Sequence, residues 1–368
     1  MNRDSRRILL LVLAILALLA ALWAGWIRIG WNWPALQPGL IAAHGPLMVC
    51  GFLGTLIALE RAIALHRSWM YVAPLLSGIG SMALILGFSG LAAKVLITAG
   101  SLVLVLIFYI ILREHMAPYT VVMALGSAAW LIGNLLWIFN WPVFRLVPWW
   151  MGFLVLTIAG ERLELGRLRR LSPAVTSMFY GSTGIFLLGL LVSLWSAQAG
   201  MRLVGLGMLA LAVWLGRYDI ARRTIRQQGL PRFAATSLLT GYFWLGVGGV
   251  LALVYGAVPA GPAYDAILHS VFVGFVMAMI FGHAPIVFPA VSGLPVRYSW
   301  SYYIPLALLN VSVALRILGD IFLIQPLRMW GGLLNGVSIL IFLIMILVYS
   351  VVFSNLELKE SRDIISDG

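Results

Sequence analysis

The sequence predicts an all-α fold, a polytopic membrane bundle of about twelve transmembrane helices. Hydrophobic residues make up 62% of the 368 residues and charged residues only 10%, whereas soluble domains are about 25% charged. The apolar residues also gather in runs of roughly 20, the length that crosses a bilayer. Because the polar connections are too short for a soluble domain, residues 1–368 are expected to form a single transmembrane domain.

Each long apolar run is assigned to one span. Because the loops between runs are short, helices that follow one another in the chain are expected to pack as antiparallel neighbours. The single cysteine, Cys50, excludes an internal disulfide framework. The twelve predicted spans are 8–30, 37–66, 71–89, 92–113, 118–139, 143–168, 174–197, 201–218, 234–258, 262–291, 299–324 and 328–355.

The basic residues are distributed as in a membrane protein. The net charge is +12, but its arginines gather in short loops, as at Arg217, Arg222 and Arg223, so nucleic acid is not an expected partner. With the N-terminus inside, most Lys and Arg residues fall on the inner side. We therefore expect both termini in the cytoplasm and the inner (plasma) membrane of a bacterium or archaeon as the location. Six basic residues remain on the outer half: Arg28, Lys94, Arg145, Arg202, Arg316 and Arg328.

Three spans share a sequence pattern, which indicates an internal repeat. The segments are 51–61 (GFLGTLIALER), 152–162 (GFLVLTIAGER) and 274–284 (GFVMAMIFGHA). His283 of the third segment stands where the first two have Glu60 and Glu161. Chance similarity among apolar helices is the alternative. A true repeat means three four-helix units, spans 1–4, 5–8 and 9–12, around a pseudo-threefold axis.

Few other charges interrupt the spans. Arg316 and Asp320 share a helix face at i and i+4 and are expected to pair. The neighbours Glu60–Arg61 and Glu161–Arg162 are expected to be charge pairs at inner helix ends, with a proton-entry role as the alternative. The sequence shows no catalytic triad, phosphate-binding loop or cysteine metal cluster, so no catalytic residues are predicted.

His44 and His269 are the candidate cofactor ligands, because an imidazole is costly in hydrocarbon and by default indicates a function there. Each lies about seven residues into its predicted span from the outer end, so both rings are expected roughly 10 Å below the outer surface. Two imidazoles at one depth on co-directional helices can hold the iron of a low-spin haem. The alternative is that each bonds to the backbone or a hydroxyl of a neighbouring helix.

Small residues beside the first histidine favour a flat cofactor. Gly45 and Gly51 leave room for a macrocycle, and Met48, one turn below His44, is expected to lie against it.

His283 lies fourteen residues after His269, near the same helix face. A second haem there would need a partner at equal depth, and His66 lies too deep. The expected cofactor is therefore one haem b, or two if His283 also binds iron. The alternatives for His283 are a structural role or an inner polar site with Glu60 and Glu161. The remaining histidine, in the loop sequence REHMAP, is expected to be solvated.

These residues resemble a known superfamily. The stretch His44-Gly-Pro-Leu-Met-Val-Cys-Gly-Phe52 resembles the second helix of haem–copper oxidase subunit I and the H-x-x-x-M-x-x-G-F stretch of the NnrS family. His269, followed by Phe288–Pro289 and Ser292–Gly293, is similar to the tenth helix of the oxidases. The layout of twelve spans in three groups of four is also that of the oxidases.

The resemblance implies a pseudo-threefold oxidase-like fold in which His44 and His269 are the axial ligands of a b-type haem. It also implies that basic residues near the outer ends of spans 11 and 12 hold the haem propionates. Arg328 matches best, and Arg316 and Arg145 are alternative outer cations. Interfacial snorkelling is the other reading of these arginines.

Two departures from the oxidase pattern limit the expected chemistry. Ile267 stands where the oxidases have a histidine for their high-spin haem, and no histidine lies between His115 and His269 to bind copper. The chain is therefore not expected to be a terminal oxidase by itself.

Three functions follow as hypotheses. The first is a membrane b-type cytochrome with one low-spin bis-histidine haem, serving electron transfer or a nitric oxide or redox response, with a quinone or a redox partner subunit as partner. The second is a cofactor-free transporter or permease, favoured by the helix interruptions at Gly45–Pro46 and Ala284–Pro285. The third is a membrane anchor subunit of a respiratory complex.

Overall fold

The computed structural model describes residues 3–88, 90–167 and 171–366, and this part of the chain is helical with no strand. Within it, twelve helices are long and apolar enough to cross a membrane. The predicted class, an all-α polytopic membrane protein, is confirmed to that extent. In chain order the helices are α1 (Arg3–Ile29), α2 (His44–Pro46), η1 (Leu47–Gly54), α3 (Thr55–Ala64), η2 (Ser68–Tyr71), α4 (Val72–Ile85), α5 (Gly90–Glu114), α6 (Pro118–Ile138), α7 (Val143–Gly166), α8 (Pro173–Val192), α9 (Ala197–Tyr218), α10 (Ala221–Thr224), α11 (Leu230–Tyr255), α12 (Pro262–His269), η4 (Ser270–Met277), α13 (Ala278–Ser292), η5 (Trp300–Tyr302), α14 (Tyr303–Ile321) and α15 (Gln325–Ser366).

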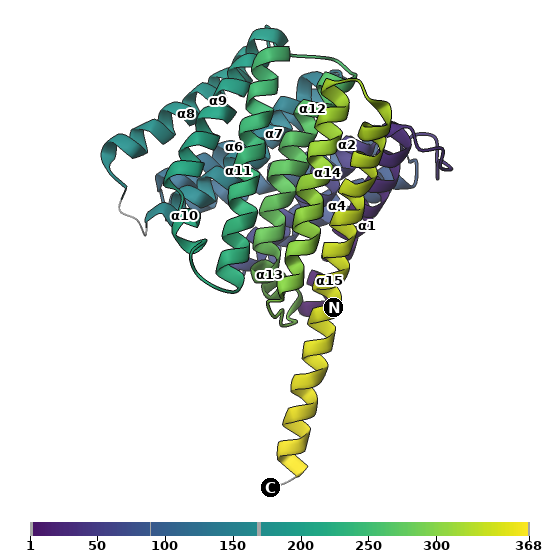
Figure 1. Ribbon diagram of the computed structural model, residues 1–368, viewed down its shortest axis with the longest axis vertical. Coiled ribbons are helices and arrows are strands. Elements are labelled where there is room, and N and C mark those ends of the chain that lie inside the picture. The colour runs from purple at the N-terminus through teal and green to yellow at the C-terminus, as the bar shows by residue number, and fades with distance from the viewer. Residues whose placement is uncertain (1–2, 89, 168–170, 367–368) are drawn as a thin grey trace.

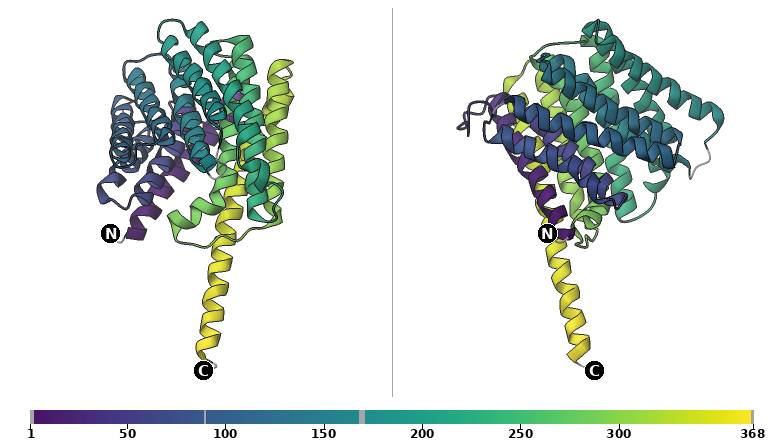
Figure 2. Two further views of the ribbon diagram at one scale, coloured as in Figure 1. Left: turned by 90° about the vertical axis from the view of Figure 1, so that its left-hand side faces the viewer. Right: turned by 180° about the vertical axis from the view of Figure 1, so that it is seen from behind.

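The long helices lie side by side in one bundle (Figures 1 and 2). Helices joined by short loops pack most extensively, among them α4 with α5, α6 with α7, α8 with α9 and α14 with α15, as the loop lengths predicted. The two described ends of the chain lie toward the same end of the bundle, and α15 extends beyond it (Figure 1). An even number of spans requires this placement.

Helix α7 is the most buried of the twelve long helices, with 83% of its 18-residue apolar stretch buried. Its ring Phe153 stacks on Trp130 of α6, with ring centroids 4.7 Å apart. Trp130 in turn covers Gly54, where a Cβ would lie only 2.3 Å from the indole. Only glycine therefore permits the close approach of η1 to α6.

Both histidine-bearing spans contain an eight-residue π-helical segment. The segment η1 begins three residues after His44, and η4 begins directly after His269. A π-helical turn widens the helix locally and is often found at functional sites.

The predicted start of span 2 at residue 37 is wrong, because the helix begins at His44 and residues 38–43 before it form turns. Gln37 explains the break: its Oε1 accepts a hydrogen bond from Gly39 N at 2.7 Å, and its Nε2 donates to Leu84 O at 3.0 Å. A side chain that bonds its own backbone competes with the helix. His44 is therefore the first residue of its helix, whereas His269 is the eighth residue of α12, as predicted.

The predicted charge pairs within Glu60–Arg61 and Glu161–Arg162 are also wrong. Arg61 pairs with Glu161 across helices α3 and α7. Arg162 pairs with Asp219 at the end of α9 through two hydrogen bonds of 2.8 and 2.9 Å. Adjacent residues on a helix point in different directions, so their partners lie on other helices.

Candidate functional site

His44 and His269 lie close together inside the bundle. Their ring centroids lie 6.4 Å apart, and the ring planes differ by 19°. The two rings line a cavity of about 450 Å³, called here the histidine cavity. Helices α2 and α12 thus bring together the two residues that the sequence predicted as ligands.

The Nδ1 atom of each imidazole is hydrogen-bonded to a backbone carbonyl. His44 Nδ1 lies 2.7 Å from Ala21 O of α1, and His269 Nδ1 lies 2.8 Å from Asp265 O, one turn earlier in α12. Because a carbonyl only accepts hydrogen bonds, Nδ1 carries the proton and Nε2 keeps its lone pair. His44 bonds to the backbone of a neighbouring helix, as the alternative interpretation expected, whereas His269 bonds to the backbone of its own helix. In the described part of the chain, however, neither Nε2 has a hydrogen-bond partner.

Two glycines leave space around the His44 ring. A Cβ on Gly25 of α1 would lie 2.7 Å from His44 Cε1, so the ring occupies the place that a side chain would take. A Cβ on Gly45 would meet open space, and Gly45 lines the cavity together with Met48. The prediction for Gly51 is wrong: its Cβ position faces Ser81 Oγ at 2.7 Å, so Gly51 packs against α4 instead of the cavity.

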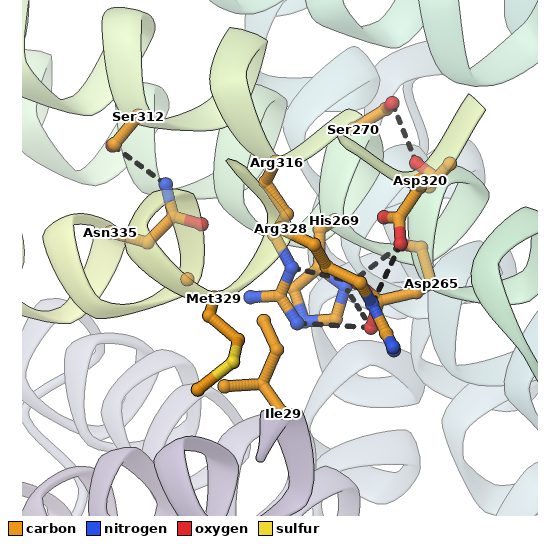
Figure 3. Close-up of polar contacts among 12 residues, drawn as sticks. Ile29, Asp265, His269, Ser270, Ser312, Arg316, Asp320, Arg328, Met329 and Asn335 are labelled. Atoms are coloured by element: carbon orange, nitrogen blue, oxygen red, sulfur yellow. Dashed lines mark hydrogen bonds and ion pairs between the residues drawn. The ribbon is translucent and has the colours of Figure 1, made fainter. Parts of the chain in front are cut away.

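A cluster of opposite charges contributes Asp265, Arg316 and Arg328 to the wall of the histidine cavity. Figure 3 shows its contacts. Arg316 Nε and Nη2 donate to the two carboxylate oxygens of Asp265 at 2.8 and 2.9 Å. Arg328 Nε lies 2.8 Å from Asp320 Oδ1 and 3.7 Å from Asp265 Oδ2. The Asp265 carboxylate also lies 3.3 Å from His269 Nδ1, so one aspartate joins the imidazole to both arginines.

The predicted Arg316–Asp320 pair is therefore wrong. Helix α12 packs against α14 and places Asp265 opposite Arg316, where both carboxylate oxygens meet the planar guanidinium. A bidentate pair is stronger than a single contact along one helix face. Asp320 forms its ion pair with Arg328 of α15.

Arg316 and Arg328 both line the histidine cavity, as predicted, but Arg145 does not. Arg145 donates to the carbonyl oxygens of Ser193 and Leu194 at 3.2 and 3.0 Å, and its guanidinium lies 4.5 Å from the ring centroid of Trp141. Arg145 therefore caps the C-terminal end of α8. Both remaining loop histidines, His66 and His115, are exposed.

Sequence reasoning missed four residues of this site: Gly25, Arg28, Asp265 and Asn335. Asp265 carried a usable signal, because it lies four residues before His269 and so shares its helix face. Arg28 stood out as an outer cation without being assigned to the site. Gly25 gave no signal, because its contact with His44 comes from a different span.

A second cavity, of about 190 Å³, brings together Glu60, Glu161 and His283, the three residues that align in the shared sequence pattern. It is called here the acid cavity. His66 is not among its lining residues. In the ranges that the structure describes, no group of three or more His, Cys, Asp or Glu side chains is arranged to hold a metal ion.

The fold and the two cavities define a class: a polytopic all-α membrane protein with paired imidazoles inside its bundle. The chain belongs to the family described as a domain of unknown function, DUF8744, whose model matches residues 7–351. No curated protein matches this sequence.

Proposed function

We propose that this protein is a membrane b-type cytochrome that binds one low-spin haem between His44 and His269. The supporting observation is the spacing of the rings. Imidazole–metal bonds of about 2.0 Å on both sides of one iron put the two ring centroids roughly 6.3 Å apart. The measured separation is 6.4 Å.

The surroundings of the two rings fit a haem. The cavity of about 450 Å³ falls within the range of roughly 300–1,000 Å³ that is usual for cofactor sites. Gly45 presents open space beside His44, so nothing there blocks a flat ring. Arg28, Arg316 and Arg328 line the same cavity and would hold the haem propionates.

The chain's own residues orient the ligands. The bonds from Nδ1 to Ala21 O and Asp265 O fix both tautomers and aim Nε2 away from those carbonyls. Asp265 also supports His269 electrostatically while it neutralises Arg316. A haem held by these two histidines would supply one-electron transfer.

We propose an oxidase-like, pseudo-threefold arrangement of three four-helix units, both termini in the cytoplasm, and a bacterial or archaeal plasma membrane as the location. The function is electron transfer, or a redox or nitric oxide response, with a quinone or a redox partner subunit as partner. Since Ile267 stands where the oxidases have a histidine, and no histidine lies between His115 and His269, we propose no oxygen-reducing centre.

The absorption spectrum of the purified protein tests the proposal. We expect sharp low-spin haem b bands on reduction and one haem per chain. His44→Ala and His269→Ala should lose these bands, whereas the exposed His66→Ala and His115→Ala should keep them. A folded, colourless protein after expression with abundant haem would overturn the proposal.

A further inference from the structure

The acid cavity lies below the histidine cavity along the same helices. Helix α1 lines the acid cavity with residues between Leu11 and Leu18, and the histidine cavity with residues between Leu22 and Ile29. The two cavities are separated by one layer of side chains, since four residues line both. The shared residues are Phe52, Leu53, Met277 and Ile339.

The walls of the acid cavity are almost entirely apolar, with polar groups at one end. There, Glu161 is bound by Arg61, and His283 Nδ1 bonds to Met279 O at 2.7 Å. The Glu60 carboxylate and His283 Nε2 have no hydrogen-bond partner among the residues that the structure describes. Glu60 does interact electrostatically with Glu161, Arg61 and His283.

Glu60 and His283 are half-buried and line the cavity, so their unpartnered carboxylate and imidazole nitrogen are available to a ligand. Because both residues line one cavity, they indicate a bound partner there. That partner must offer hydrogen-bond donors such as hydroxyl groups at one end and apolar surface elsewhere. An inorganic anion does not fit, because Glu60 and Glu161 repel it, and an iron-bound macrocycle lacks a second histidine here.

The volume of the acid cavity limits the size of the ligand that it can hold. About 190 Å³ is smaller than the usual pocket for a drug-sized ligand and suits a single ring system. The surrounding residues from α1, α13 and α15 are aliphatic or aromatic, as in Ile15, Phe288 and Leu343. A membrane-soluble ring compound with oxygen substituents satisfies both the volume and the polar end.

We propose that the acid cavity binds the head group of a membrane quinone or quinol. Glu60 and His283 Nε2 each accept a hydrogen bond from a quinol hydroxyl, because His283 Nδ1 already carries the ring proton. A protonated Glu60 donates a hydrogen bond to the carbonyl of the oxidised ring. The choice of a redox-active ring compound rests on the proposed cytochrome function, because the cavity lies one side-chain layer from the histidine cavity. The binding site itself is defined by this chain's own residues.

Calorimetric titration of the full-length protein in lipid nanodiscs tests the proposal, with reduced and oxidised decylubiquinone and with menadione as probes. We expect saturable binding of at least one quinone, with one site per chain. Glu60→Gln and His283→Leu should each weaken the affinity about tenfold, the loss expected for one hydrogen bond to a charged or buried polar group. Ala284→Phe, which fills the cavity, should abolish binding.

Val311→Phe is the matched control, because Val311 is 55% exposed on α14 and lines neither cavity. Its affinity should equal that of the unmodified chain. Absence of saturable binding by the haem-loaded protein, or equal binding by Ala284→Phe and Val311→Phe, would overturn the inference. Preferential binding of an apolar amine such as dodecylamine, with no quinone binding, would also overturn it.

The double variant His44→Ala/His269→Ala separates this inference from the proposed function. Quinone binding by this haem-free protein supports the acid cavity as a site in its own right. If the unmodified chain binds quinone but never haem, the cytochrome proposal fails while the binding site stands. If it binds haem but no quinone, only the present inference fails.

Discussion

The histidine cavity and the acid cavity are both lined by α1, η1, α7, η4 and α15. They differ in whether their polar side chains have partners within the protein. At the histidine cavity, both Nδ1 atoms are fixed by carbonyls, and Asp265 is matched by arginines. At the acid cavity, Arg61 matches only Glu161, and Glu60 has no ion-pair partner among the described residues. A site with fixed ligands suits a permanently bound cofactor. A site with unsatisfied groups suits a ligand that comes and goes.

The largest expected effect is at the histidine cavity. Gly25→Val places a side chain where the His44 ring lies, 2.7 Å from Cε1, and should displace the ring and abolish haem binding. The measurement is haem content per chain after purification. Gly181→Val on α8 is the matched control, because a Cβ there meets open space. Full haem content in Gly25→Val would show that the position of the His44 ring is not needed.

A smaller effect is expected when the charge balance of the histidine cavity changes. Asp265→Asn removes an anion close to His269, so the oxidised haem, with its extra positive charge, becomes less favourable. The midpoint potential should rise by an amount on the order of tens of millivolts, given an effective dielectric constant of about 20. Asp320→Asn, which does not line the cavity, should produce a smaller rise in the same redox titration. A fall in potential for Asp265→Asn would contradict the assigned role.

Replacing the two carboxylates of the acid cavity is expected to change the stability of the protein by different amounts. Glu161→Gln leaves Arg61 without its charge partner and should destabilise the protein by about 1–3 kcal/mol. Glu60→Gln removes a carboxylate that has no ion pair and should leave the melting temperature unchanged or raise it. Thermal unfolding of both variants in the same detergent makes the comparison. Equal destabilisation would show that Glu60 has a structural partner.

The smallest effect is expected at Arg145, which lies outside both cavities. Arg145→Gln should keep the haem content and the midpoint potential of the unmodified chain, while Arg316→Gln changes the potential. The reason is that Arg145 bonds to the carbonyls at the end of α8, away from the histidines. Loss of haem from Arg145→Gln would return it to the group of propionate-binding candidates.

Much of this architecture was predictable because it depends on length and composition. Apolar runs long enough to span a bilayer predicted all twelve helices, and the shared direction of two spans predicted that His44 and His269 would meet. The break before His44 was not predicted, because the Gln37 side chain replaces helical bonds in an otherwise apolar run.

The pairing of charges was not predictable for a different reason. Which partner an arginine finds depends on how far each helix is rotated, and spacing along one chain does not give that rotation. Arg316 therefore meets Asp265 of α12 instead of Asp320 on its own helix. The role of Gly25 likewise depends on a contact between α1 and α2 that no pattern within either segment indicates.

The most direct test of the central claim is the electron paramagnetic resonance spectrum of the oxidised, purified protein. Two imidazoles on one iron predict a low-spin ferric signal from one haem per chain. That signal should be lost from both His44→Ala and His269→Ala, with any retained haem becoming high-spin. A high-spin signal from the unmodified protein, or a low-spin signal that survives either substitution, would contradict the claim that these two histidines hold one iron between them.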